Sequence, residues 1–252
     1  MQTLKIARAL ACREHNITLL CARNTPLEKE SRQFNIKTKA LFKDDLHILP
    51  AIRQIGNLCK EEAFDVVHTH LSHDLWTLVP AMKLKKYKTP LFLTKRMASS
   101  VIKKDVFHSY LYKRVDRILT ISNFIRQNVI NTCPVKPETV FTLFNGLEIE
   151  KYNPGKYRKT EVREELGIDQ AAKVIGIVGR FTLKKGHKEF LHAARQIRDE
   201  SNITTRFLIV GGASHGEAAY ENEIRDLITQ LKLDQDIICL LYTSPSPRDS
   251  IA

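Results

Sequence analysis

One segment of the chain, residues 174–190, constrains the fold more than any other. It begins with five apolar residues that are mostly β-branched, Val-Ile-Gly-Ile-Val. This composition is typical of a strand that is buried on both faces of a parallel sheet. Gly179 ends the run, and Arg180, Lys185 and Gly186 follow before an amphipathic helix. The segment therefore predicts a strand, a loop and a helix of an α/β fold.

The loop between this strand and this helix carries two cations. In an open α/β sheet, ligands bind just outside the carboxyl ends of the strands, which is where Arg180 and Lys185 are expected. Fixed cations beside a glycine, which lets a ligand approach the backbone, are suited to clamping a diphosphate. The same cations also suit an ordinary solvated loop. The segment alone leaves both interpretations open.

The rest of the chain alternates strand-like and helix-like patterns, which indicates an α/β fold with parallel sheets. Apolar runs predict strands at 16–21, 64–69, 90–94, 117–121, 139–143, 174–178 and 206–210. Apolar residues at helical spacing predict helices that include 44–59, 73–85, 105–114 and 187–199. Another helix is expected after 117–121, with Ser122 as its N-cap.

A polar stretch that contains Pro154 divides the chain. We expect residues 1–149 to form a first unit, residues 150–160 to connect the two units, and residues 161–238 to form the first part of a second unit. A length of 252 residues is compatible with one or two domains, each with a sizeable core.

Three further segments carry recognisable motifs. Phe64–His70 reads Phe-Asp-Val-Val-His-Thr-His, and Asp116–Asn123 reads Asp-Arg-Ile-Leu-Thr-Ile-Ser-Asn. Leu143–Pro154 reads Leu-Phe-Asn-Gly-Leu-Glu-Ile-Glu-Lys-Tyr-Asn-Pro. Each motif is weak by itself. In this order, and followed by the Gly-Arg-x4-Lys-Gly pattern at 179–186, they resemble the retaining GT-B glycosyltransferases of family 4.

The resemblance implies two Rossmann-like domains with parallel sheets, in which residues 1–149 form the acceptor side and the second domain binds a nucleotide sugar. Arg180 and Lys185 would hold the donor's two phosphates, and the backbone of Gly179 and Gly186 would line the donor loop. The implied reaction is transfer of a hexose from a nucleotide sugar to a glycan or a lipid-linked acceptor. Cell-surface polysaccharide or lipopolysaccharide synthesis is the expected setting. No metal and no cofactor would be required.

The resemblance also implies that His70 is catalytic, because the family places a histidine here, near the sugar and the reacting centre. A structural histidine or a helix cap is the alternative. A metal site built from His68, His70 and His73 is a further alternative, since strand alternation puts the first two on one face. Lys95 and Arg96 would meet either an anionic acceptor or solvent.

Both ends of the chain depart from the family pattern. The chain opens on a helix, so we expect the first strand of the doubly wound unit to be missing and Met1 to be an internal or misassigned start. The family's two glutamates, eight positions apart, have no counterpart. We therefore expect a fragment that is inactive by itself. Residues 239–252 break the α/β pattern, and the back-translation of Cys239–Asp249 resembles a transposase-type sequencing adapter; a disordered Ser/Pro tail is the alternative.

The chain is strongly basic, with a formal net charge of +12. Lysines cluster at 83–88 and at 103–104 without a nucleic-acid-binding motif, which argues against a nucleic-acid partner. The basic face is either solvated or attracted to an anionic membrane surface or a phosphorylated acceptor. Five scattered cysteines suit reduced thiols, and no apolar run approaches the ~18–20 residues of a membrane span. We expect a cytoplasmic protein, peripheral at the inner membrane face.

Two other functions compete with glycosyl transfer. One is a different Rossmann-type nucleotide-sugar enzyme of the epimerase kind, which is disfavoured because no strand is followed by Gly-x-Gly-x-x-Gly. The other is a non-catalytic module that binds phosphate or nucleic acid, which only the net charge suggests.

Overall fold

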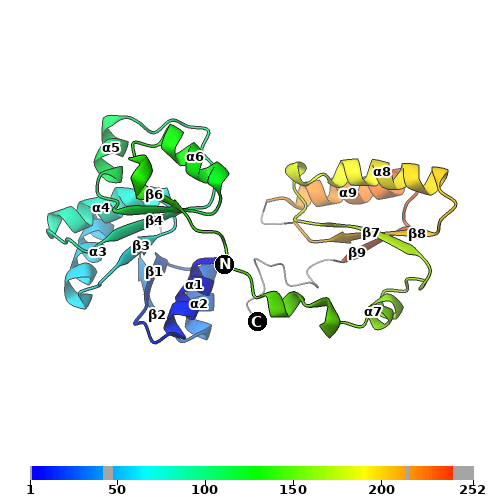
Figure 1. Cartoon of the computed structure of the whole chain (residues 1–252), viewed down its shortest axis with the longest axis horizontal. Coiled ribbons are helices and arrows are strands. Elements are labelled where there is room, and N and C mark those ends of the chain that lie inside the picture. Colours follow the sequence, from blue (N-terminus) through cyan, green and yellow to red (C-terminus); the bar gives the residue numbers. More distant parts are fainter. Residues whose placement is uncertain (1, 42–47, 214–215, 241–252) are drawn as a thin grey trace. The chain divides into compact units, whose positions relative to one another are not determined.

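The computed structural model describes residues 2–41, 48–213 and 216–240 (Figure 1). The chain divides into two compact units, Met1–Gly146 and Leu147–Ala252. Each unit combines helices with parallel strands. This is the α/β class that the alternating sequence pattern predicted.

The first unit alternates helices and strands along nearly its whole length. Its strands are β1 (Thr18–Ala22), β2 (Lys37–Leu41), β3 (Val67–Thr69), β4 (Leu91–Lys95), β5 (Arg117–Thr120) and β6 (Val140–Thr142). Its helices are α1 (Gln2–Ala11), α2 (Pro26–Gln33), α3 (Ile48–Glu62), α4 (Leu75–Leu84), α5 (Val106–Tyr112) and α6 (Asn123–Thr132), with short 3-10 turns η2 (Ser72–Asp74) and η3 (Pro137–Thr139).

The strands of the first unit form two parallel sheets. β1 pairs with β2, and β3, β4, β5 and β6 form a four-stranded sheet in sequence order. Each neighbouring pair in the larger sheet is parallel. The carboxyl ends of β3 to β6 therefore share one edge, and the residues that follow them are brought together there.

The core of the larger sheet depends on α4 and on the alternation of side chains along the strands. Leu91 and Leu93 of β4 and Ile118 of β5 are buried, and Val79 and Met82 of α4 are completely so. All five belong to one apolar cluster. Burial of a leucine- or isoleucine-sized side chain contributes about 1.5–3 kcal/mol, so this packing holds the strand ends in place.

Side-chain caps fix where two helices of this unit begin. The Ser122 hydroxyl accepts a hydrogen bond from the backbone N–H of Ile125 at 3.2 Å, which confirms the predicted N-cap of α6. Asp105 caps α5 by accepting from the N–H groups of Phe107 and His108, both at 3.0 Å. Such caps contribute about 1 kcal/mol each.

The second unit is smaller. It contains the 3-10 turns η4 (Ile149–Tyr152), η5 (Pro154–Lys156) and η6 (Leu183–Lys185), and the helices α7 (Lys159–Glu165), α8 (His187–Glu200) and α9 (Ala218–Gln230). Its strands β7 (Lys173–Val178), β8 (Thr205–Val210) and β9 (Ile237–Leu240) form one parallel sheet in sequence order. Helices α8 and α9 lie side by side against one face of this sheet (Figure 1).

The prediction that residues 174–178 are buried on both faces is wrong. β7 is an edge strand of the described sheet, and Val174, Ile175 and Val178 are 37%, 39% and 75% exposed. The physical reason is that the apolar faces of α8 and α9 converge on the central strand β8, where Phe207 and Ile209 are almost fully buried. Within the described residues, the apolar composition of β7 therefore does not correspond to a central position in its sheet.

The last described strand extends further than the sequence pattern indicated. Cys239 and Leu240 pair in parallel register with Ile209 and Val210 of β8, so the α/β pattern continues two residues past Ile238. The pairing fits the composition, because both added residues are apolar and only partly exposed. The rest of the expected tail, residues 241–252, lies outside the described residues.

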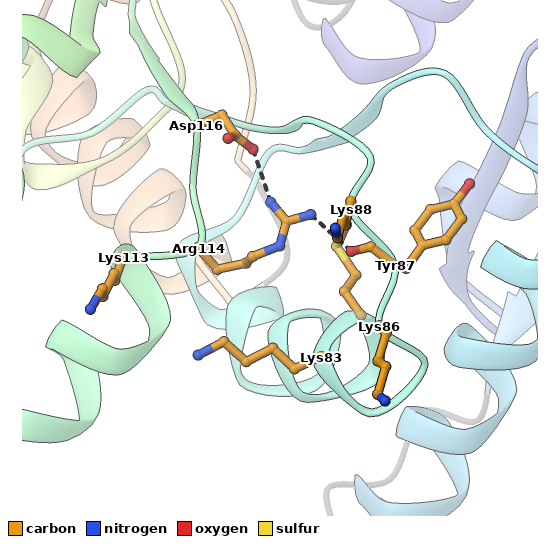
Figure 2. Close-up of a pocket in the computed structure, with 8 residues that line it drawn as sticks. Lys83, Lys86, Tyr87, Lys88, Lys113, Arg114 and Asp116 are labelled. Atoms are coloured by element: carbon orange, nitrogen blue, oxygen red, sulfur yellow. Dashed lines mark hydrogen bonds and ion pairs between the residues drawn. The ribbon is translucent and has the colours of Figure 1, made fainter.

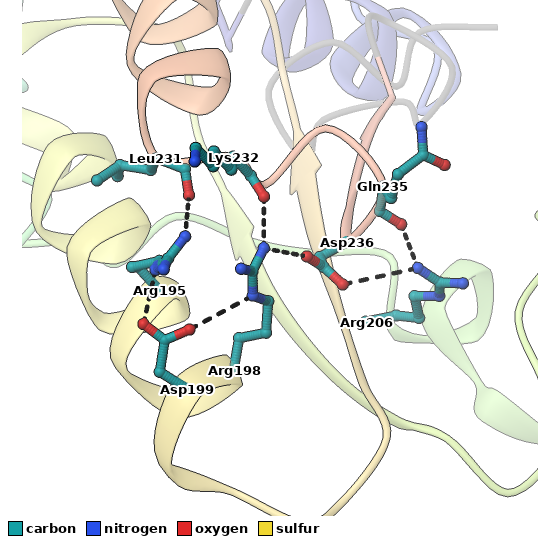
Figure 3. A network of polar contacts seen from close by, with 8 residues as sticks. All are labelled: Arg195, Arg198, Asp199, Arg206, Leu231, Lys232, Gln235 and Asp236. Atoms are coloured by element: carbon teal, nitrogen blue, oxygen red, sulfur yellow. Dashed lines mark hydrogen bonds and ion pairs between the residues drawn. The ribbon is translucent and has the colours of Figure 1, made fainter.

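A polar network ties the amino end of the second sheet to its helices (Figure 3). Arg198 near the end of α8 binds Asp236 at 3.2 Å and donates to the carbonyl of Lys232. Asp236 also pairs with Arg206 at the start of β8, at 4.0 Å. These contacts join α8, β8 and the loop before β9. They lie at the opposite end of the sheet from the loop that follows β7. That loop therefore takes no part in the network.

Within the described ranges, no helix is both long enough and apolar enough to cross a membrane. All five cysteines lie in the described ranges, and none forms a disulfide.

Candidate functional site

The first group of candidate residues lies at the carboxyl edge of the four-stranded sheet. His70 directly follows β3, Arg96 directly follows β4, and Asn145 lies in the segment after β6. Parallel pairing brings these strand ends to one side. Residues that are 26 and 49 positions apart in the chain are thereby placed in hydrogen-bond contact.

Arg96 is the centre of this group. Its Nη2 lies 3.3 Å from Nδ1 of His70, and its Nη1 donates to Oδ1 of Asn145 at 3.3 Å. From its sequence position, Arg96 was expected to meet either an anionic acceptor or solvent. The structure instead shows a guanidinium that holds His70 on one side and is itself held by Asn145 on the other.

Burial keeps His70 neutral, and the contact with Arg96 determines which ring nitrogen carries the proton. Burial, with further contributions from His68 and Arg96, lowers the pKa of His70 to about 3, so the imidazole is neutral at physiological pH. A guanidinium has N–H donors and no acceptor. Nδ1 of His70 must therefore accept, and the single ring proton is on Nε2. His70 consequently presents a hydrogen-bond donor to any ligand that Nε2 faces.

His68 supports His70 from the same face of β3. The centroids of the two rings are 4.3 Å apart, and Nε2 of His68 contacts the Thr94 hydroxyl at 2.7 Å. Among the residues that the structure describes, no three His, Cys, Asp or Glu side chains are arranged to hold a metal ion. The alternative of a metal site built from His68, His70 and His73 is therefore not supported.

The segment after β3 is held by its own hydrogen bonds. The Thr69 hydroxyl donates to Oδ2 of Asp74 at 2.7 Å, across the short turn that contains His70. Lys95, at the end of β4, donates to the Ser72 hydroxyl at 3.4 Å. Burial, with a smaller effect of Lys103, lowers the pKa of Lys95. The turn is thus fixed both internally and to the neighbouring strand.

The second group of candidate residues lies in the loop after β7. Gly186 has a left-handed backbone (φ 78°) and serves as the N-cap of α8 without a side-chain cap. The first N–H groups of a helix lack intrahelical partners and attract anions. The Lys185 side chain lies along Gly179, where an added Cβ would be 3.7 Å from Cδ of Lys185. Arg180 and Lys185 therefore both flank Gly179, next to the start of α8.

The backbone of this loop is fixed by the end of β8. The N–H of Gly179 donates to the carbonyl of Val210 at 2.9 Å, and that of Phe181 donates to the carbonyl of Gly212 at 3.1 Å. Gly211 lies between these two contacts with φ 147°, and a Cβ there would be 2.0 Å from the Gly179 carbonyl oxygen. Only glycine allows this close approach of the two chains.

Arg180 has a carboxylate close by in the second unit. Its Nη1 lies 3.8 Å from Oε2 of Glu217, the residue that precedes α9. The Arg180 side chain is 56% exposed, so the pair is partly solvated and weak. A bound anion would compete with Glu217 for the guanidinium, and Glu217 keeps that side chain near the loop.

His187, the first residue of α8, packs beneath the loop. It is completely buried, and its ring stacks on Phe181 with centroids 4.8 Å apart. Within the described ranges, neither ring nitrogen has a partner with hydrogen-bond geometry. Burial lowers the pKa of His187, although the nearby backbone of Gly179 acts in the opposite direction. His187 is thus a neutral aromatic support for the loop.

The sequence motifs predicted which residues follow the strands, but they did not predict which residues contact one another there. His70, Arg180, Lys185, Gly179 and Gly186 all follow strands, as expected. The motifs did not reveal several supporting residues, which are Arg96 as the partner of His70, Asn145, Gly211, Glu217 and His187. Gly211 is followed by Gly212 in the sequence, and such a pair is typical of a turn or loop but does not reveal the contact with Gly179.

Two family models match the chain. The model described as Glycosyltransferase Family 4 matches residues 1–151, and the model described as Glycosyl transferases group 1 matches residues 158–249. The first model alone covers more than half of the chain. The chain therefore belongs to glycosyltransferase family 4, which confirms the resemblance seen in the motifs.

Curated relatives are similar at low identity. A D-inositol 3-phosphate glycosyltransferase of Corynebacterium kroppenstedtii is 24% identical over 208 residues, which are 77% of this chain and 45% of the relative. A UDP-Gal:alpha-D-GlcNAc-diphosphoundecaprenol alpha-1,3-galactosyltransferase of Escherichia coli is 26% identical over 218 residues, which are 79% of this chain and 54% of the relative. The chain spans about half the length of these relatives.

Solved structures share the fold. A glycosyltransferase of Rickettsia africae superposes with a TM-score of 0.80 at 19% identity. The superposition covers 96% of this chain and 64% of the Rickettsia chain. Anabaena HepE in complex with UDP and glucose superposes with a TM-score of 0.72 at 18% identity. The superposition covers 98% of this chain and 66% of the HepE chain. The fold is thus an α/β fold with parallel sheets that resembles GT-B glycosyltransferases.

Proposed function

We propose that this chain is part of a retaining glycosyltransferase that transfers a hexose from a nucleotide sugar to a glycan or a lipid-linked acceptor. The observation that carries the proposal is the loop after β7. Arg180 and Lys185 flank Gly179 there, and the loop runs directly into the uncapped amino end of α8. Fixed cations and unpaired N–H groups together are suited to a diphosphate.

The proposed role of this loop is to bind the leaving group. Transfer breaks the bond between the anomeric carbon and the diphosphate oxygen, and negative charge develops on that oxygen. Preorganised cations stabilise such charge most strongly in the transition state. Arg180 and Lys185 would supply this stabilisation, while the backbone at Gly179 and Gly186 lets the phosphates approach closely. Because two side-chain cations neutralise the diphosphate, we propose that transfer proceeds without added metal.

The proposed role of His70 is to donate a hydrogen bond from Nε2 to the sugar or to the acceptor at the reacting centre. Its neutral state and its contact with Arg96 support this role. A histidine whose pKa is about 3 does not take up a proton at neutral pH, so His70 would orient the substrate and not shuttle protons. Arg96 acts through His70 as a positioning residue.

The relatives support the choice of substrates. The E. coli relative is named for transfer of galactose from UDP-Gal to a diphosphoundecaprenol-linked sugar, and HepE was solved with UDP and glucose. We propose a UDP-sugar donor and a lipid-linked or glycan acceptor for this protein, in cell-surface polysaccharide or lipopolysaccharide synthesis. An anionic membrane at the inner face of the cell envelope is the proposed partner surface.

Calorimetric titration of the 252-residue chain with UDP, with and without a chelator of divalent metals, tests this function. The proposal expects saturable binding that is unchanged by the chelator and absent for uridine, which lacks the phosphates. Binding that requires Mg²⁺ would contradict the two-cation arrangement. Equal binding of uridine and UDP would show that the loop does not recognise a diphosphate.

A further inference from the structure

The outer surface of α5 is apolar where a solvated helix would be polar. Val106, Phe107 and Tyr110 are 82%, 71% and 46% exposed, while Leu111 on the inner side is buried. Trp76 at the start of α4 is 39% exposed and adds to the same surface, since its ring centroid lies 6.5 Å from that of Phe107. Contiguous exposed aromatic side chains of this kind mark interaction sites.

Lysines adjoin this apolar surface. Nζ of Lys83, near the end of α4, lies 3.6 Å from the centroid of the Tyr110 ring. Lys83 also lines an open cavity of about 440 Å³ together with Lys86, Lys88 and Lys113. Figure 2 shows the amino groups of Lys83, Lys86 and Lys113 apart from the ion pair of Arg114 and Asp116. The contact of Lys83 with Tyr110 therefore joins the lysines of the cavity to the aromatic residues of α5.

The balance of charge on this surface is positive. Arg114 is occupied, because it binds Asp116 at 2.9 Å and the carbonyls of Tyr87 and Thr89. Asp105 at the start of α5 pairs with His108. Among the described residues, none of the four lysines of the cavity forms an ion pair with a carboxylate. Their charges are available to an external anion.

We propose that this surface docks the protein onto an anionic lipid bilayer. The α4–α5 surface, as we call it, comprises Trp76, Lys83, Lys86, Lys88, Val106, Phe107, Tyr110 and Lys113. Tryptophan and tyrosine favour the interface between headgroups and acyl chains, and lysine stems extend along apolar surface to reach phosphates. The exposed apolar side chains of Val106 and Phe107 can insert between the headgroups and the acyl chains of a bilayer.

The surface adjoins the candidate site through a short connection. Residues 97–105 join Arg96 to α5, and Val101 and Ile102 in this connection are 61% and 69% exposed. The inference rests on the proposed function in one respect, because a lipid-linked acceptor gives a reason for docking at this place. Docking itself requires no sugar donor, so it can be measured separately.

Binding of the 252-residue chain to vesicles tests the proposal. The vesicles are made of phosphatidylcholine, with or without an equal amount of phosphatidylglycerol. Trp76 is the one tryptophan of the sequence, so its emission reports on this surface alone. The proposal expects a blue shift and co-sedimentation with the anionic vesicles only, both weakened by salt.

Two sets of variants separate the apolar and the charged contributions. Val106→Ser with Phe107→Ser should abolish the blue shift, and Lys83→Gln, Lys86→Gln and Lys113→Gln together should lower the partition coefficient by about fivefold for each charge removed. The matched controls lie in the second unit. Ile203→Ser replaces a residue that is 57% exposed, and Lys159→Gln, Lys173→Gln and Lys232→Gln remove the same net charge from exposed positions.

The outcomes distinguish the partner. Equal binding to both kinds of vesicle, or equal losses in the variants and their controls, would overturn the proposal. Binding to heparin without binding to anionic vesicles would overturn it in favour of a polyanion. The UDP titration keeps the two proposals apart. If the unaltered chain binds UDP but does not bind anionic vesicles, docking is contradicted and the donor-site proposal stands.

Discussion

Arg96 and His70 are joined by a contact of 3.3 Å between guanidinium and imidazole, although 26 positions separate them in the chain. The contact makes Nδ1 an acceptor and leaves the ring proton on Nε2. The position of the N–H group that His70 presents to a ligand therefore depends on Arg96, which follows the neighbouring strand β4.

Arg96→Met should free the tautomer of His70. Without the guanidinium, both ring nitrogens can carry the proton, and the pKa of His70 should rise from about 3, although burial, its largest cause, remains. Nitrogen NMR shifts of the His70 ring measure both quantities. Arg117→Met is the control, since Arg117 contacts the Asp116 carbonyl and Phe141. An unchanged Nε2–H tautomer in Arg96→Met would contradict the positioning role.

Arg180→Ala and Lys185→Ala should each weaken UDP binding by about 10- to 100-fold, the range expected when a charge-assisted hydrogen bond is lost. In any longer, active form that carries these residues, kcat/KM should fall by about one to three orders of magnitude. Lys184→Ala, at the exposed neighbouring position, is the matched control. Calorimetry that finds unchanged UDP affinity in both variants would remove the diphosphate role.

Gly211→Ala should destabilise the second unit by more than ~2 kcal/mol, because the new Cβ would collide with the Gly179 carbonyl and φ would stay in the left-handed region. The collision is 2.0 Å at φ 147°, whereas an added Cβ at Gly146 meets nothing within 4 Å. Gly146→Ala is therefore the control. Urea unfolding followed by circular dichroism compares the two variants, and equal midpoints would show that the close approach is not required.

The stability of the first unit should fall as the pH decreases below about 6.5. The folded-state pKa values of His68 and His70 are both lowered, that of His70 to about 3, so the unfolded chain binds more protons in the window below the unfolded pKa. Each proton decreases the free energy of unfolding by at most about 1.4 kcal/mol per pH unit, and by less for a partly exposed ring.

Urea unfolding followed by Trp76 fluorescence at several pH values measures this slope, since Trp76 lies in the first unit. His70→Asn should make the slope shallower. Thr94→Val removes the partner of His68 at 2.7 Å without removing a titrating group, so it should lower stability and keep the slope. A stability that does not change from pH 7 to 5 would contradict the buried, neutral histidines.

The sequence determined the α/β class, the family and the position of most elements. Hydrophobic runs with period two or 3.6 and cap residues such as Ser122 are local signals, and local physics suffices to interpret them. The order of strands and loops also placed His70, Arg180 and Lys185 after strands, at the edge where parallel sheets bind ligands, and their roles in binding and catalysis stay predictions. The sequence pattern failed for the burial of β7, since apolar composition does not distinguish a central strand from an edge strand.

Only the tertiary structure decided which of these residues touch. Arg96 contacts His70 because β3 and β4 pair in parallel, and Gly211 must be glycine because β8 brings it against Gly179. Trp76 and Phe107, which are far apart in the sequence, meet only after α4 and α5 pack together. Strand register and helix packing depend on the whole core, and a motif confined to a few residues does not contain that information.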